Sequence, residues 1–279
     1  MMNAYWMKPL VGVGLAWIVV TRGVGAEPVA LPLWEAGVFA GAASTPAYPA
    51  STERSYRGLV LPYLVYRGDI VRADRGGIGA RLVHTDAMEL DVGFAASLPA
   101  SSSDIAARKD MPDLGTLIEF GPRLKGTLAN PAAGGRVRFE LPLRSVLEIN
   151  NGVRSQGYAL EPEVIYEIHD AGGNWRLSTS VSAVLGDSAL NQYFYGVPAA
   201  FATAQRPAYE ARAGLIATRL TINAAKSIGP NLRVYGLARY ESYAHSANQS
   251  SPLYLQTAGT SIGVGVSWTL GRSTTMARD

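Results

Sequence analysis

The stretch RVRFELPLRSVLE, residues 136–148, alternates apolar and charged side chains almost without interruption. The apolar set is Val137, Phe139, Leu141, Leu143 and Leu147, and the charged set between them is Arg136, Arg138, Glu140, Arg144 and Glu148. Because successive side chains of a β-strand point to opposite faces, the stretch predicts a strand with one apolar face and one charged face. Such a strand fits a soluble sandwich with its charges in water. It equally fits a membrane barrel with its charges inside, so the rest of the chain decides.

The same alternation recurs in long stretches elsewhere in the chain. They are MELDVGFAASL at 88–98, YALEPEVIYEI at 158–168, WRLSTSVSAVL at 175–185, LRVYGLARYE at 232–241 and TSIGVGVSWTL at 260–270. Strands of soluble proteins usually have about five or six residues, whereas a tilted strand that crosses a bilayer needs about nine to eleven. Tyr158, Trp175, Tyr240 and Trp268 stand near strand ends on the apolar face, where the aromatic girdle of a membrane barrel lies. Length and aromatic position therefore both favour a membrane barrel.

The connections between the expected strands also favour a barrel. We expect strands near 33–43, 58–66, 69–74, 78–83, 88–98, 115–126, 136–148, 157–168, 174–185, 212–225, 231–241 and 258–270. All the long connections fall at the same end, at 44–57, 99–115, 186–211 and 242–257. Outer-membrane barrels have this asymmetry of short periplasmic turns and long outer loops, and they close because a sheet edge in lipid leaves backbone groups unpaired. The fold class predicted is all-β: a transmembrane antiparallel β-barrel of about 12 strands, with 10 as the alternative.

The N-terminal segment is expected to be separate from this barrel. Residues 1–26 combine Lys8, an apolar run over 10–20 and small residues up to Ala26, which is the pattern of a cleaved secretory signal peptide. A retained anchor is the alternative, although the run is short for a membrane helix. The expected domains are a signal peptide over 1–26 and a barrel over 27–279, located in the outer membrane of a Gram-negative bacterium.

Composition excludes several functions. The chain has no cysteine, which removes disulfides, thiol nucleophiles and thiolate metal sites. Loss of Lys8 and Arg22 with the signal peptide leaves a net charge of (25 − 2) − 22 = +1, and the arginines are scattered among acids. We therefore expect no nucleic-acid partner. The three histidines, His84, His169 and His245, fall in two turns and a loop, so no metal, cofactor or catalytic site is expected, and the protein is not expected to be an enzyme.

Two sets of residues are candidates for a functional site. The charged strand positions should point into the lumen, and they are Arg136, Arg138, Glu140, Arg144, Glu161, Glu163, Glu167, Arg176, Arg233, Arg239 and Glu241. Glu140 and Arg144 are candidates to pair with the glutamates of the next strand, because isolated charges in a low dielectric are costly. The second set is Tyr193, Phe194 and Tyr195 in a long outer loop. This loop either folds inward and packs on itself, or forms a plug or recognition surface.

The sequence also resembles the MipA/OmpV family, named for the MltA-interacting protein. The resemblance is carried by LWEAGVFAGAASTPAYPAS at 33–51, LPYLVYRGDIVRADRGGIGARL at 61–82, MPDL at 111–114, EFGP at 119–122, QYFYGVP at 192–198, RPAYEA at 206–211 and SPL at 251–253. It implies an outer-membrane barrel. For the namesake it implies a structural role that brings a murein lytic transglycosylase together with a bifunctional penicillin-binding protein, while other relatives are more similar to osmoregulated or adhesion-related surface proteins.

Three classes of function remain open. The first is an envelope scaffold for murein (peptidoglycan) enzymes, and its contact surface would be the periplasmic turns 127–135 and 169–173 with the C-terminal tail. The second is a small-solute channel or a surface-exposed adhesion or osmoregulated protein. An outer-membrane hydrolase ranks last, because the chain has no G-x-S-x-G motif.

Overall fold

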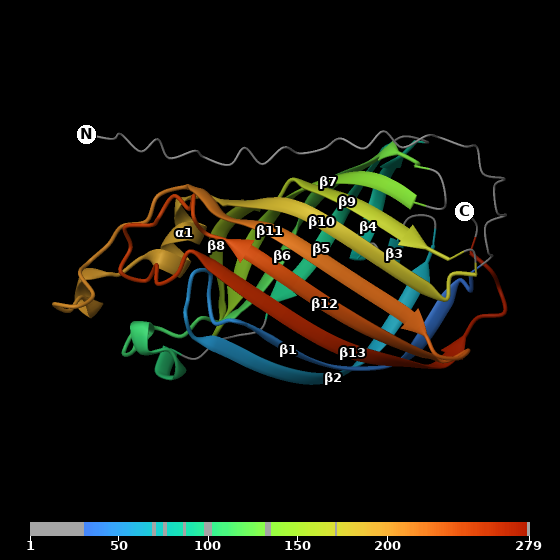
Figure 1. Ribbon diagram of the computed structural model, residues 1–279, viewed down its shortest axis with the longest axis horizontal. Coiled ribbons are helices and arrows are strands. Elements are labelled where there is room, and N and C mark those ends of the chain that lie inside the picture. The colour runs from blue at the N-terminus through green and yellow to red at the C-terminus, as the bar shows by residue number, and fades with distance from the viewer. Residues whose placement is uncertain are drawn as a thin grey trace, which may run out of the picture.

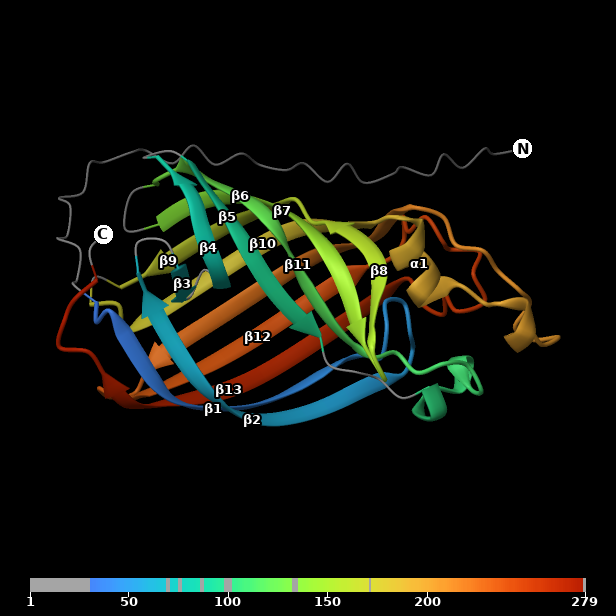
Figure 2. The same ribbon diagram turned by 180° about the vertical axis from the view of Figure 1, so that it is seen from behind.

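The computed structural model describes residues 31–68, 71–74, 77–85, 88–97, 102–131, 135–170 and 172–277, which form one antiparallel barrel of steeply tilted strands (Figures 1 and 2). The strands are β1 (Trp34–Pro46), β2 (Arg54–Arg67), β3 (Val71–Asp74), β4 (Gly77–His84), β5 (Met88–Ser97), β6 (Thr116–Ala129), β7 (Gly135–Ile149), β8 (Val153–Leu160), β9 (Glu163–His169), β10 (Trp175–Gly186), β11 (Gly214–Ser227), β12 (Leu232–Ser242) and β13 (Ala258–Arg272). Each strand pairs with its neighbour in sequence, except that β8 and β9 do not pair with each other. The sheet closes because β1 pairs with β13.

The expected strand over 157–168 is in fact two strands. β8 and β9 lie end to end in the same place of the wall, since β7 pairs with β8 at Leu143↔Leu160 and with β9 at Phe139↔Val164. The break falls at Glu161 and Pro162, and a proline has no N–H to donate to the ladder. The wall of the described barrel therefore has 12 strand positions, which confirms the expected strand number.

Alternation along the strands separates an apolar outer face from a polar inner face. In β10, Val181 is 59% exposed, whereas Ser180 and Ser182 beside it are each 6% exposed. Val181 lies next to Val164 of β9 and Leu220 of β11, and Leu220 lies next to Tyr240 of β12. All four are exposed, so a continuous apolar hoop runs around this side of the barrel, as lipid contact requires.

The strands of the barrel wall are short at β3 and β4, which have 4 and 8 residues, whereas β2 has 14. Over the described residues, β2 pairs with β1 from Arg54 to Tyr66 but with β3 only at Tyr66 and Arg67. β2 is also apolar on both faces: Val60 and Leu64 are exposed outside, and Leu59 and Leu61 lie on the inner face. This strand therefore departs from the apolar-out, polar-in rule that β10 illustrates.

The two ends of the barrel differ. The long connections gather at one end, and they carry the helix α1 (Ser188–Tyr195) and the short 3₁₀ helices η1 (Ser102–Asp104), η2 (Ala106–Arg108) and η3 (Ala199–Phe201) (Figure 1). We call this the loop end and the opposite one the turn end. The connection between β1 and β2 is shorter than expected, 47–53 rather than 44–57, because both strands continue further. Every helix in the described part of the chain is too short to span a membrane. The expected signal peptide, 1–26, lies outside the described residues.

Candidate functional site

The inner wall at mid-height is held by ion pairs between neighbouring strands. Asp91 of β5 lies opposite Arg123 of β6 and accepts from its Nε at 3.0 Å and its Nη2 at 2.7 Å. Lys125, two residues further along β6, lies 2.6 Å from the same carboxylate and 3.3 Å from that of Glu89. Bidentate and shared pairs of this kind offset the cost of removing charges from bulk water.

A second group of charges lies closer to the loop end. Arg144 of β7 bridges Glu119 at 3.2 Å and Glu161 at 3.1 Å. Arg219 of β11 bridges Glu161 at 2.9 Å and Glu241 of β12 at 2.7 Å. Glu161 stands where Pro162 breaks the wall strand, so this network joins β6, β7, β11 and β12 across the interior.

A third group forms the rim at the turn end. Arg138 lies 2.9 Å from Glu140 and 3.3 Å from Glu167, and Arg176 lies 2.8 Å from Glu167. Among the described residues, Arg136 and Arg233 have no carboxylate within 4.0 Å. Arg233 donates instead to the hydroxyl of Ser227 at 2.9 Å and to the carbonyl of Gly173 at 3.4 Å. The rim thus carries positive charge that the described wall does not neutralise.

The structure places every expected lumen charge on the inner face of the barrel. Eight residues line the central cavity: Arg136, Arg138, Glu140, Arg144, Glu163, Glu167, Arg176 and Arg233. The other three, Glu161, Arg239 and Glu241, lie on the same inner face nearer the loop end. The expected pairing of Arg144 with Glu161 is present. Glu140, however, pairs with Arg138 and Arg123 rather than with the next strand.

Sequence reasoning missed several members of the networks. Asp91, Arg123 and Arg219 are central to the ion pairs but stand outside the expected lumen set. Asp91 and Arg123 each stand between two apolar residues, in LDV at 90–92 and PRL at 122–124, and Arg219 stands between Thr218 and Leu220. The same alternation with a period of two could have assigned them to the inner face.

The lumen is a cavity of about 1350 Å³ that opens at the turn end. Its lining starts with Thr127, His169 and Trp175 beside the turns and reaches Ala43 and Ser180 in the strands. Nearer the loop end, buried side chains of the wall strands and of the loops pack together in the interior. In the described part of the barrel the lumen is therefore open at the turn end and packed at the loop end, and we call this cavity the cup.

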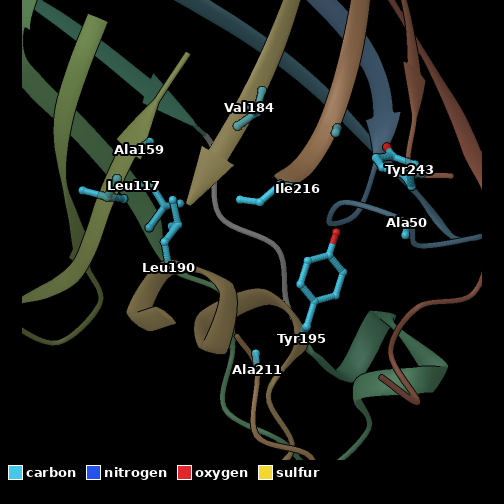
Figure 3. Close-up of a cluster of buried hydrophobic side chains, with 11 residues drawn as sticks. Ala50, Leu117, Ala159, Val184, Leu190, Tyr195, Ala211, Ile216 and Tyr243 are labelled. Atoms are coloured by element: carbon cyan, nitrogen blue, oxygen red, sulfur yellow. The ribbon is translucent and has the colours of Figure 1, made fainter. Parts of the chain in front are cut away.

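The cup is closed by a cap that we define as α1 with the cluster beneath it (Figure 3). The cluster joins buried side chains of five wall strands to α1, and its members are Leu117, Val146, Ala159, Val184, Ile216, Ala217, Leu190, Tyr195, Ala50, Ala211 and Tyr243. Asp187 caps the first turn of α1 by accepting from the N–H of Leu190 at 2.9 Å. Leu190 and Tyr195 are almost completely buried, so α1 seals the loop end as a packed core would.

Buried amides tie the loops of the cap together. Asn248 donates to Oδ1 of Asn191 at 2.8 Å and to the carbonyl of Arg212 at 2.9 Å. The hydroxyl of Ser251 donates to the carbonyl of Tyr195 at 2.7 Å, and that of Tyr48 donates to the carbonyl of Leu253 at 2.9 Å. Each link joins segments far apart in sequence. The loops at this end and the cap are therefore held together as one unit.

The three aromatic residues 193–195 belong to this cap. They lie in α1 and not in an irregular loop, and Tyr195 is fully buried. Tyr193 and Phe194 are partly buried between the cluster beneath α1 and a second hydrophobic cluster, which consists of Tyr48, Ile105, Met111, Leu114, Val197 and Leu253. Burial raises the pKa of both tyrosines, and Tyr193 donates to Glu148 at 3.2 Å. Burial also raises the pKa of Tyr48 to about 12. These hydroxyls therefore stay neutral; a plug or recognition role for the three residues stays a prediction.

The two histidines whose side chains the structure describes, His169 and His245, do not form a cluster. His169 ends β9 at the turn end, and His245 lies in the loop between β12 and β13 at the opposite end. His84 ends β4, and its side chain is outside what the structure describes. Among the described residues, no group of three acidic or histidine side chains is placed to hold a metal ion.

A closed antiparallel barrel with an apolar outer face, a charged interior and all long loops at one end is a transmembrane β-barrel of the outer-membrane class. A family model for the MltA-interacting protein MipA matches residues 38–270, and the chain belongs to this family. The protein is thus an outer-membrane β-barrel protein of the MipA family. No curated protein matches the chain.

Solved structures with a similar outline are also outer-membrane proteins. OmpT expressed in the outer membrane of Vibrio cholerae is 7% identical, with 90% of this chain and 100% of that chain covered and a TM-score of 0.37. The outer membrane phospholipase A from Escherichia coli is 10% identical, with 86% of this chain and 94% of that chain covered and a TM-score of 0.33. OpdO of Pseudomonas aeruginosa is 9% identical, with 85% of this chain and 96% of that chain covered and a TM-score of 0.28. These values are too low to transfer any function.

Proposed function

We propose that this protein is a non-enzymatic outer-membrane scaffold that binds murein-processing enzymes at its turn end, which faces the periplasm. The partners are a murein lytic transglycosylase and a bifunctional penicillin-binding protein, as the family name and resemblance suggest. The observation that carries the proposal is the cup itself. A lumen that the cap closes at the loop end suits a scaffold better than a solute channel.

The turn end offers the partner a firm surface. The C-terminal tail is not free there: the N–H of Leu33 donates to Thr275 at 2.8 Å, and the N–H of Ala277 donates to Leu31 at 2.8 Å. In the neighbouring turn, Asp170 accepts from the N–H of Trp175 at 2.8 Å, which lowers the pKa of its carboxyl group and keeps it ionised. Arg136 and Arg233 add positive charge to the same rim, where an acidic partner surface would dock.

Co-purification from native envelopes tests this proposal. The tagged barrel should retain the lytic transglycosylase, and replacing residues 127–135 and 169–173 with glycine–serine segments of equal length should abolish that retention. Of these turns, residues 132–134 and 171 lie outside the described residues.

The matched control replaces residues 199–206, at the loop end, in the same way, and it should leave capture unchanged. Heat-shift gels would first establish that both variants fold. The scaffold proposal is wrong if the turn variant captures as much enzyme as the wild type while the loop variant loses it.

A further inference from the structure

The lumen has two chemically different walls, and the scaffold role explains neither. One sector, formed by β12, β13, β1 and β2, is apolar where it faces the cavity. Phe39, Leu59, Tyr235 and Leu237 line it, with small residues between them. A strand wall that only holds water would carry polar side chains on this face.

The apolar sector is shaped as a smooth trough. Phe39 and Tyr235 meet edge to face, with ring centroids 5.9 Å apart, and the hydroxyl of Tyr235 is within 3.1 Å of that of Ser267. A side chain at Gly265 would come within 2.6 Å of the Phe39 ring. Glycine at this position therefore lets the ring lie flat along the wall. Leu61, on the inner face of β2, is 53% exposed and extends the apolar surface.

The remaining sector is charged and has an excess of cations. The described lining contains nine cationic side chains (Arg57, Arg67, Arg123, Lys125, Arg136, Arg138, Arg144, Arg176 and Arg233) and five carboxylates (Glu89, Asp91, Glu140, Glu163 and Glu167). Two of these cations, Arg67 and Arg144, pair with carboxylates just outside the lining, those of Glu35, Glu119 and Glu161. Arg136 and Arg233, which have no carboxylate within 4.0 Å among the described residues, stand near the open end. An anion that enters the cup meets them before it meets the paired charges.

We propose that the cup binds an anionic single-chain amphiphile, with its acyl chain along the apolar sector and its carboxylate or phosphate head against the rim arginines. Charge complementarity selects the head group, and burial of the chain drives binding. The cavity of about 1350 Å³ exceeds the roughly 300–1,000 Å³ of ordinary small-molecule pockets. It therefore accommodates a long chain together with hydrating water. A fatty acid and a lysophospholipid share this chemistry.

Photolabelling tests the proposal with the full-length mature barrel in phosphatidylcholine vesicles. The probe is palmitate that carries a diazirine on its chain. Mass spectrometry should place adducts on the inner-face residues of β1, β2 and β12, and unlabelled palmitate should compete for them. Hexadecanol, which has the chain without the charge, should compete several-fold less well. Lysophosphatidylglycerol is the second competitor, and it distinguishes a lysophospholipid ligand from a fatty acid. Whichever of palmitate and lysophosphatidylglycerol competes better identifies the natural head group.

Paired variants distinguish the lumen from the lipid face. Leu59→Gln should reduce inner-face labelling several-fold, whereas Val60→Gln, one residue along on the outer face, should not. Arg136→Gln combined with Arg233→Gln should abolish the advantage of palmitate over hexadecanol. Adducts confined to outward residues such as Val60 and Val264, or equal competition by the two molecules, would show ordinary lipid contact and overturn the proposal. Heat-shift gels of each variant confirm folding beforehand.

Discussion

Replacing residues 188–211 with a short glycine–serine linker is expected to turn a silent barrel into a conducting one. The wild-type protein should pass little or no current in planar bilayers, because α1 and the cluster beneath it fill the lumen at the loop end. The replacement removes Leu190 and Tyr195, the two α1 side chains that are buried deepest in that cluster. Steady single-channel steps should then appear, limited in size by the remaining pairs of Arg219 with Glu161 and Glu241.

The matched control replaces the turn at 169–173, which belongs to the opposite end of the barrel. It should leave the wild-type current unchanged. Large and steady conductance of the wild-type protein would instead show an open pore and favour the solute-channel function over the scaffold.

Leu141→Arg is expected to destabilise the barrel by roughly 2–4 kcal/mol if the residue lies at the bilayer midplane, because it places a charge against lipid. Leu141 is on the outer face of β7, opposite Leu124 of β6. Arg138→Leu, three residues away on the inner face, should cost on the order of 1 kcal/mol or less. Glu140 and Glu167 each keep a second cation, Arg123 at 3.5 Å and Arg176 at 2.8 Å.

Urea titrations of both variants in the same lipid vesicles measure the free energy of unfolding directly, and heat-shift gels give a quick comparison. Equal destabilisation by the two substitutions would mean that the inner and outer faces have been assigned the wrong way round.

The strands could be predicted because a period of two is a local property of the sequence. Residues 136–148 alternate well enough to place β7 within about a residue at either end. The prediction of one strand over 157–168 was wrong at Pro162. The alternation of side chains continues through this residue, but a proline has no backbone N–H to donate to the neighbouring strand. β1 and β2 run further than expected, since serine, threonine and arginine near 44–57 read as loop residues yet continue the ladder.

The interior could be predicted only in part. Alternation assigns Arg144 and Glu161 to the inner face, but the partner of each charge depends on register and on side-chain length. Glu140 illustrates this: it stands opposite Glu163, a like charge, and its ion pairs are with Arg138 on its own strand and Arg123 on β6.

The hydrogen bonds that hold the loops at the cap could not be predicted. Asn191 and Asn248 are 57 residues apart and belong to no periodic pattern, so no local feature of the sequence reports their hydrogen bond. The apolar sector of the lumen was also missed, since its glycines and alanines in β1 and β13 are as compatible with an outer face as with an inner one.

The orientation of the barrel is the claim on which the scaffold, the cup and the cap all depend, and cysteine labelling measures it. The natural chain has no cysteine, so single variants give a clean signal. Asn130→Cys places a thiol in the turn between β6 and β7, and Ala204→Cys places one in the loop between β10 and β11; both sites are exposed. The reagent is a maleimide on a polyethylene glycol chain too large to pass through porins. Intact cells should label Ala204→Cys at once and Asn130→Cys only after the outer membrane is permeabilised. The reverse order would place the cap in the periplasm and contradict the account.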